Sequence, residues 1–138
     1  MIKVLKSVID KIKSTIGQEP IESGGIIGGK DNTITHFCFD NANNHSDYVP
    51  NVELMNKVIE EWANEDVMLY GVIHSHPFYS PKPSKEDLRY ALKLKENNPF
   101  LDPIIFPILI RNKQEEIEVY FYQLIDNDFK QIEVEIHG

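Results

Sequence analysis

Cysteine, cationic side chains and long apolar runs are all scarce in this chain of 138 residues. The single cysteine, Cys38, cannot form an internal disulfide, which fits a reducing compartment better than a disulfide-stabilised secreted fold. No apolar stretch approaches the roughly 20 residues that a membrane-spanning helix needs. The first residues also lack the uninterrupted apolar core of a signal peptide. We therefore expect a cytoplasmic protein in which Cys38 is an inert residue of the core.

The charge balance is acidic, with 14 Lys and Arg against 22 Asp and Glu and a net charge of -8 at pH 7. No basic stripe is evident along the chain. Nucleic acids and anionic membranes are polyanions that bind basic surfaces, so we expect neither as a partner. The length suits one domain, residues 1–138, that buries about two-thirds of the surface of the unfolded chain.

Hydrophobic periodicity predicts strands mixed with covering helices. Amphipathic helices are expected over residues 2–16 and 52–64, and a third helix is expected after Ser84. Expected strands cover residues 23–28, 33–40, 69–74, 104–110, 117–125 and 132–136. Pro103 and Pro107 favour an edge position or a bulge for the strand at 104–110. This order of elements predicts an α/β fold, with a mixed β-sheet flanked by helices.

Two histidines follow one of the expected strands at close spacing. Residues 69–73 form a short apolar run that predicts a buried strand continuing into His74. Because side chains alternate faces along a strand, His74 and His76 should point the same way. Pro77 lacks a backbone donor and should end the strand.

A helix start follows the proline-rich loop after these histidines. Ser84 has the character of an N-cap before the helix-compatible residues 88–96, so Asp87 would lie in the first helical turn. If the loop folds back, His74, His76 and Asp87 form a set of two imidazoles and one carboxylate. Three such ligands with one position open to water are typical of a catalytic zinc site. Taken alone, Ser84-x-x-Asp87 also fits a simple capping arrangement.

Peptide cleavage at such a site also needs a group that moves a proton from water to the leaving amine. The chain has no His-Glu-x-x-His helix, and the best remaining carboxylate is Glu22, ahead of the glycine-rich residues 24–29. Neighbours such as Ile21 and Ile26 would partly desolvate Glu22 and raise its pKa toward a useful range. The alternative is a solvated loop carboxylate, which is the commoner environment of a glutamate.

These residues form a motif in three parts: Glu22-x-x-Gly25, His74-x-His76-Pro77 and Ser84-x-x-Asp87. The motif resembles that of the JAMM (MPN-plus) metalloproteases, and among them most closely the small prokaryotic JAB members. The resemblance implies the JAB/MPN fold, whose mixed sheet is similar to that of cytidine deaminases. It implies one Zn2+ per chain, with His74, His76 and Asp87 as metal ligands. It also implies Glu22 as the general acid/base and Ser84 as a group that stabilises the tetrahedral oxyanion.

The activity implied by the resemblance is that of a deubiquitinase-like isopeptidase or peptidase that cuts after the C-terminus of a ubiquitin-like protein. Trimming or release of a small sulfur-carrier protein would use the same chemistry. Aromatic residues Phe78 and Tyr79 and the loop at 41–50 are expected to line a groove for the C-terminal tail.

A non-catalytic MPN-type scaffold that binds proteins is the alternative from another class, although the complete residue set speaks against it. A nucleobase deaminase would need a His-x-Glu element and a Pro-Cys-x-x-Cys pair, which a chain with Cys38 alone does not supply.

Overall fold

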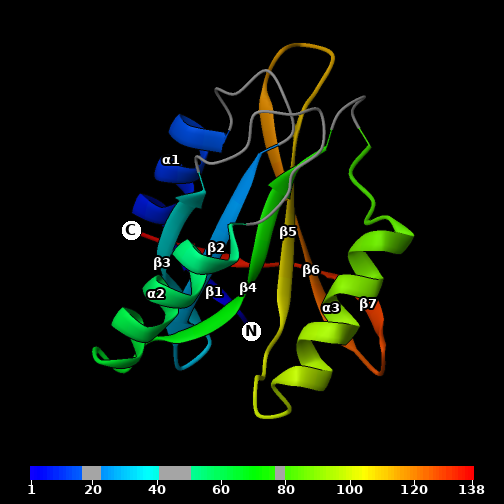
Figure 1. The fold of residues 1–138 in the computed structure, drawn as a ribbon. Coiled ribbons are helices and arrows are strands. Elements are labelled where there is room, and N and C mark those ends of the chain that lie inside the picture. Colours follow the sequence, from blue (N-terminus) through cyan, green and yellow to red (C-terminus); the bar gives the residue numbers. More distant parts are fainter. Residues whose placement is uncertain (17–22, 41–50, 77–79) are drawn as a thin grey trace.

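The computed structural model of the chain describes residues 1–16, 23–40, 51–76 and 80–138 (Figure 1). Within these ranges the helices are α1 (Lys6–Thr15), α2 (Val52–Ala63) and α3 (Lys85–Asn97). The strands are β1 (Lys3–Leu5), β2 (Gly24–Lys30), β3 (Thr33–Asp40), β4 (Met68–Ser75), β5 (Ile105–Arg111), β6 (Ile117–Ile125), β7 (Asp128–Ile132) and β8 (Glu135–His137). None of the helices in the described ranges has the length and apolar character needed to cross a membrane.

All of these strands belong to one mixed sheet in the order β7-β6-β5-β4-β2-β3-β1-β8. The pairs β4–β5, β1–β3 and β1–β8 are parallel, and the other neighbours are antiparallel. The predicted fold class, a mixed sheet flanked by helices, is therefore confirmed.

The sheet is strongly curled, because its two outermost strands follow each other in the chain. Only Glu133 and Val134 separate the end of β7 from the start of β8. The three backbone steps from Ile132 to Glu135 span at most about 11 Å even when fully extended. The opposite edges of the sheet therefore approach each other, and the concave face between them can enclose a core.

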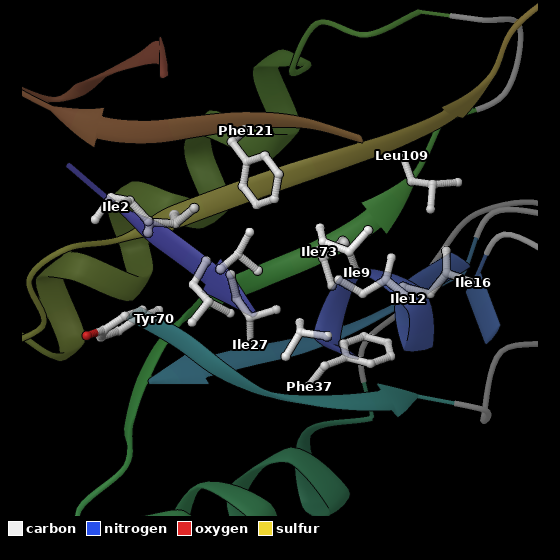
Figure 2. Packing of buried hydrophobic residues seen from close by; sticks show 14 residues of the cluster. Ile2, Ile9, Ile12, Ile16, Ile27, Phe37, Tyr70, Ile73, Leu109 and Phe121 are labelled. Carbon is white, nitrogen blue, oxygen red and sulfur yellow. The ribbon is translucent and has the colours of Figure 1, made fainter. Parts of the chain in front are cut away.

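Helix α1 fills this concave face. Ile12 of α1, Ile73 of β4 and Phe121 of β6 belong to one buried cluster, whose side chains converge in Figure 2. A second cluster lies on the opposite face, where Trp62 of α2 and Ala91 of α3 pack with Val72 of β4. Because side chains alternate along a strand, His74 lies on the same face as Val72, the face covered by α2 and α3.

The N-terminal helix prediction was wrong over residues 3–5. There the chain forms β1, which pairs in parallel with both β3 and β8. Ile2 and Val4 are buried while Lys3 is exposed, which is a strand alternation too short to be recognised in the sequence. The pairing partners lie far along the chain, so tertiary contacts override the helical pattern here.

The C-terminal prediction of one strand over 132–136 was also wrong, because this segment contains the end of β7 and most of β8. Strands β6 and β7 form a hairpin around Asp126 and Asn127, whose φ angles are 52° and 64°. Asp31 and Asn32 turn the chain between β2 and β3 in the same way, with φ of 52° and 63°. Two consecutive residues with positive φ match the twist of a tight hairpin, and Asp and Asn tolerate that conformation better than most residues.

Strand β5 lies inside the sheet between β4 and β6, so the edge position suggested by its prolines is wrong. The Leu124 amide donates to the Ile104 carbonyl, so the even-numbered residues of β5 direct their backbone groups toward β6. Pro107 therefore faces β4 with its missing N–H. The register between β4 and β5 begins at Ile108, immediately after this proline. A central strand can thus contain proline where one of its two ladders begins.

Candidate metal centre

The two histidines of the motif are held by the sheet. His74 lies in β4 opposite Gly24 of β2 and Ile108 of β5, and its side chain is 7% exposed. His76 follows the end of β4, and its backbone amide donates to the carbonyl of Leu109 at 2.9 Å. The backbone of both histidines is therefore fixed by neighbouring strands, as the apolar run before them predicts.

The start of α3 positions the carboxylate. Ser84 is the N-cap, and its Oγ accepts a hydrogen bond from the Asp87 amide at 3.1 Å. In return, Oδ2 of Asp87 accepts from the Ser84 amide at 2.8 Å, which completes a capping box with Asp in place of the usual Glu. The predicted helix start is confirmed, and the cap fixes the direction of the Asp87 side chain.

The structure brings His74, His76 and Asp87 together. Oδ1 of Asp87 lies 3.1 Å from Nε2 of His74, and Oδ2 lies 3.1 Å from Nε2 of His76. The two Nε2 atoms are 2.9 Å apart. One ligand atom from each of the three residues lies within 4.8 Å of the others. The cluster therefore offers two nitrogens and one carboxylate to a single point.

A hydrogen bond on the far side of the His76 ring indicates which of its nitrogens carries the proton. Nδ1 of His76 lies 3.1 Å from the carbonyl oxygen of Ser80. A carbonyl only accepts, so Nδ1–H must donate, and a neutral His76 then presents a lone pair at Nε2. That lone pair faces both a carboxylate oxygen and the other imidazole nitrogen.

Three short polar contacts join the ligand atoms of this cluster, and neutral histidines do not have enough protons to make a hydrogen bond in each of them. A divalent cation bound between the ligand atoms would make all three contacts favourable. Nε2 of His74 can donate toward the neighbouring atoms if it is protonated. While His76 is neutral, however, its Nε2 and the Asp87 oxygen 3.1 Å away are both acceptors, so only a proton or a cation between them makes this contact favourable. Imidazole nitrogen and carboxylate oxygen are accepted zinc ligands, with bonds of about 2.0–2.2 Å. Tetrahedral ligands at that distance are about 3.3 Å apart, close to the observed 2.9–3.1 Å. The donor set and its spacing thus fit a zinc ion.

The Asp87 carboxyl is held in its anionic form. Burial by itself raises the pKa of Asp87, but hydrogen bonds with His74 and His76 and from the Ser84 amide outweigh burial. Together they hold the pKa of Asp87 well below its usual range. Asp87 therefore contributes a negative charge at physiological pH, which favours a bound cation.

Of the two predicted catalytic residues, one is described. Ser84 is exposed at the edge of the cluster and acts as the helix cap, the simpler of its two expected roles. Glu22 lies outside the described residues, as do Phe78, Tyr79 and residues 41–50.

The segment that follows Glu22 lies beside the histidines. The Ser23 amide donates a hydrogen bond to Oγ of Ser75 at 3.0 Å. In return, the Ser75 amide donates to the Ser23 carbonyl at 2.9 Å. Ser75 is the residue between the two histidines, and Gly24 pairs with His74. The strand β2 therefore begins next to the cluster.

Two contacts at the centre were not foreseen from the sequence. The Ser80 carbonyl orients His76, and the hydroxyl of Tyr122 donates to the Pro81 carbonyl at 2.6 Å. Tyr122 is buried in β6, where its hydroxyl reaches the residues ahead of α3. Every residue has a backbone carbonyl, so the sequence does not indicate which carbonyl will accept a hydrogen bond. Strand alternation predicts the face of the sheet on which Tyr122 lies, but not the partner of its hydroxyl.

Comparisons with known proteins identify the family. A model of the family described as prokaryotic homologs of the JAB domain matches residues 5–124. The chain therefore belongs to this family, as the motif predicted. No curated protein matches the chain.

Solved structures share the fold at low sequence identity. A protein from Desulfitobacterium hafniense is 16% identical with a TM-score of 0.75, covering 99% of this chain and 93% of that one. A JAB1/MPN domain protein from Archaeoglobus fulgidus is 16% identical with a TM-score of 0.62, covering 100% and 98%. A structure described as JAMM, a metalloprotease-like zinc site in the proteasome and signalosome, is 15% identical with a TM-score of 0.59, covering 100% and 99%. These likenesses show the JAB/MPN fold.

Proposed function

We propose that this chain is a zinc-dependent peptidase or isopeptidase of the JAMM type. Its substrate would be a bond that follows the C-terminal tail of a ubiquitin-like or sulfur-carrier protein in the cytoplasm, with residues 1–138 as one catalytic domain. The observation that carries the proposal is the convergence of His74, His76 and Asp87, whose ligand atoms lie within 4.8 Å of one another.

The chain would bind one zinc ion through these three side chains. A zinc ion in such a site acts as a Lewis acid and lowers the pKa of bound water to about 7. The residues contribute orientation and charge. Donation from His76 Nδ1–H to the Ser80 carbonyl leaves Nε2 free to bind, and Asp87 supplies one negative charge.

Glu22 and Ser84 would carry the proton and charge movements. Glu22 takes a proton from the attacking water and returns it to the departing nitrogen as the C–N bond breaks. Ser84 Oγ accepts from the Asp87 amide, so its own hydrogen stays available for a developing oxyanion. Capping the helix and stabilising the oxyanion are therefore compatible roles of one hydroxyl.

The proposal is tested by turnover together with metal content. The zinc-loaded protein should cleave a fusion in which a Gly-Gly-ended ubiquitin-like or sulfur-carrier protein precedes a reporter. The Glu22→Gln variant should keep its zinc, measured by elemental analysis, and lose most turnover, because only the proton carrier is removed. Full activity in Glu22→Gln would assign the base to another carboxylate, with Glu19 as the first choice.

A protein that neither retains nor takes up zinc would favour the non-catalytic scaffold instead. Separate fusions to ubiquitin-like and sulfur-carrier bodies distinguish the two substrate classes, since both share one chemistry.

A further inference from the structure

Helix α3 and the loop residue Lys82 before it carry a small excess of positive charge. Residues 82–97, from the loop to the end of α3, hold five of the 14 Lys and Arg and three of the 22 Asp and Glu, a net charge of about +2. The rest of the chain then has a net charge of about −10. Lys95 donates to the carbonyls of Pro99 and Leu101 at the end of the helix. The other four cations have no such role.

Three of these four cations form a stripe along the helix. Lys85, Arg89 and Lys93 are all exposed and follow each other at intervals of four residues, so they lie on one face of α3. Exposed Lys82 precedes them in the loop. We call these four residues the α3 stripe. From Lys85 to Lys93 it extends about 12 Å along the helix axis.

The cations of the α3 stripe form no ion pair that would stabilise the helix, as far as the described residues show. Like charges four residues apart repel by about 0.2–0.5 kcal/mol per pair. Lys85 is the first residue of α3, where the helix dipole disfavours a cation. Within the described part of the chain, none of the four cations pairs with a carboxylate. No ion pair within the described residues therefore explains the stripe.

We infer that the α3 stripe is a docking surface for an acidic patch on the body of the protein substrate, an inference that rests on the proposed function. The helical part of the α3 stripe begins at Lys85, between Ser84 and Asp87, so it starts beside the metal centre, within reach of a protein whose tail enters that centre. In Figure 1 this helix lies at the margin of the molecule. An extended polyanion such as DNA would be repelled by the acidic remainder of the chain, so a partner with a local acidic cluster fits best.

The test compares two variants with equal net charge. Arg89→Glu/Lys93→Glu reverses the stripe, and Lys57→Glu/Lys113→Glu reverses two exposed lysines elsewhere. The substrates are a fluorogenic peptide ending in Gly-Gly and the same tail on a ubiquitin-fold protein with a clustered acidic surface. At low salt the stripe variant should raise KM for the protein substrate about tenfold with kcat unchanged. The peptide should be unaffected, and roughly 0.5 M salt should remove the difference.

An equal rise in KM for the control variant, or no rise for the stripe variant, would overturn the docking surface. Competition by a short DNA duplex at equal concentration would also overturn it in favour of nucleic acid. Fluorescence anisotropy of the labelled acidic protein measures docking without turnover. A lack of cleavage with intact, stripe-dependent binding would therefore count against the proposed function alone.

Tyr122 supports a second inference, which rests on residues 80 and 81 ahead of α3. Its hydroxyl donates to the Pro81 carbonyl, and the adjacent Ser80 carbonyl accepts from Nδ1 of His76. The geometry points to Tyr122 as a positioning residue for the metal centre. By holding residues 80–81 it keeps the Ser80 carbonyl directed at His76, and with it the nitrogen that faces the cluster.

A neighbouring tyrosine provides the matched control. Tyr120, two residues earlier in β6, donates its hydroxyl to Glu118 at 3.0 Å and not to the residues that orient His76. Tyr122→Phe should weaken zinc binding about three- to tenfold in a chelator competition, near the lower end of the loss seen when a contact that orients a metal ligand is removed. Tyr120→Phe should leave it unchanged. Faster solvent exchange of the His76 Nδ1 proton in NMR spectra should accompany the loss.

Equal zinc affinities for Tyr122→Phe and Tyr120→Phe would overturn the positioning role. A fall in affinity with an unchanged His76 signal would overturn it as well, because the effect would then not act through that ring.

Discussion

Strand β4 and helix α3 supply the two halves of the metal centre, and they are held in very different ways. Six of the eight residues of β4 are buried, and the strand pairs on both sides. Within the 13 residues of α3, Ala91 alone is buried. His74 is thus placed by the core of the protein, whereas Asp87 is placed by a capping box and a short loop. The comparison teaches that the fold can stay stable when the position of one metal ligand, Asp87, is disturbed.

The largest effect is expected from crowding β4. A Cβ on Gly71 would lie 1.7 Å from the carbonyl oxygen of Ile105 in the adjacent strand. Gly71→Ala should therefore cost about 3 kcal/mol or more, because backbone must move, and urea unfolding measures the loss. Gly138→Ala is the control, since the nearest atom to its Cβ would be 3.8 Å away. A Gly71→Ala protein of normal stability would mean that the strands can separate here without cost.

The second effect should remove the metal while leaving the fold. His76 lies beyond the end of β4, so His76→Ala removes a ligand without opening the core. Two remaining protein ligands hold zinc poorly, and elemental analysis should find little metal. His137→Ala, at an exposed histidine beside Glu135, should bind zinc normally. Full zinc occupancy in His76→Ala would remove this residue from the ligand set.

The third change separates the two roles of Ser84. Removing its cap by Ser84→Ala should cost about 1 kcal/mol of stability. The same loss is expected for Asn51→Ala, because the Asn51 side chain caps α2 by accepting from the Leu54 amide at 3.2 Å. If Ser84 also donates to the oxyanion, its variant alone should lose about two to three orders of magnitude in kcat. Equal turnover in both variants would leave Ser84 as a helix cap.

The smallest effect concerns local motion. Removing the metal with a chelator should speed amide hydrogen exchange in the first turn of α3 by about tenfold. Amides of β4 should exchange as before, because their protection comes from strand pairing on both sides. Equal acceleration in β4 and α3 would show that the two regions are coupled, and that the difference in burial does not separate their stabilities.

Local sequence patterns predict β4 and its two histidines, but they predict only the start of α3 and not the position of Asp87. The apolar run before His74 predicts a buried strand, and strand alternation predicts that His74 and His76 share a face. The N-cap character of Ser84 predicts the start of α3. Bringing Asp87 onto the histidines needed more than local pattern, since the loop that joins them has no periodicity to read.

Pairing between distant segments accounts for what the sequence did not reveal. Residues 3–5 become a strand because β3 and β8 lie on either side of them, and β8 is about 130 residues away along the chain. Strand β5 can lie inside the sheet because Pro107 faces β4 at the point where that ladder begins. Such facts belong to the sheet as a whole, so short windows of sequence do not contain them.

The two-residue link between β7 and β8 has a consequence for how copies of this protein meet. It leaves the sheet with two short outer strands, and these carry charge at Asp128, Lys130 and Glu135. Open strand edges invite addition of another chain, and short charged edges discourage it. The two edges of the curled sheet therefore offer few free backbone groups to which a strand of another copy could add.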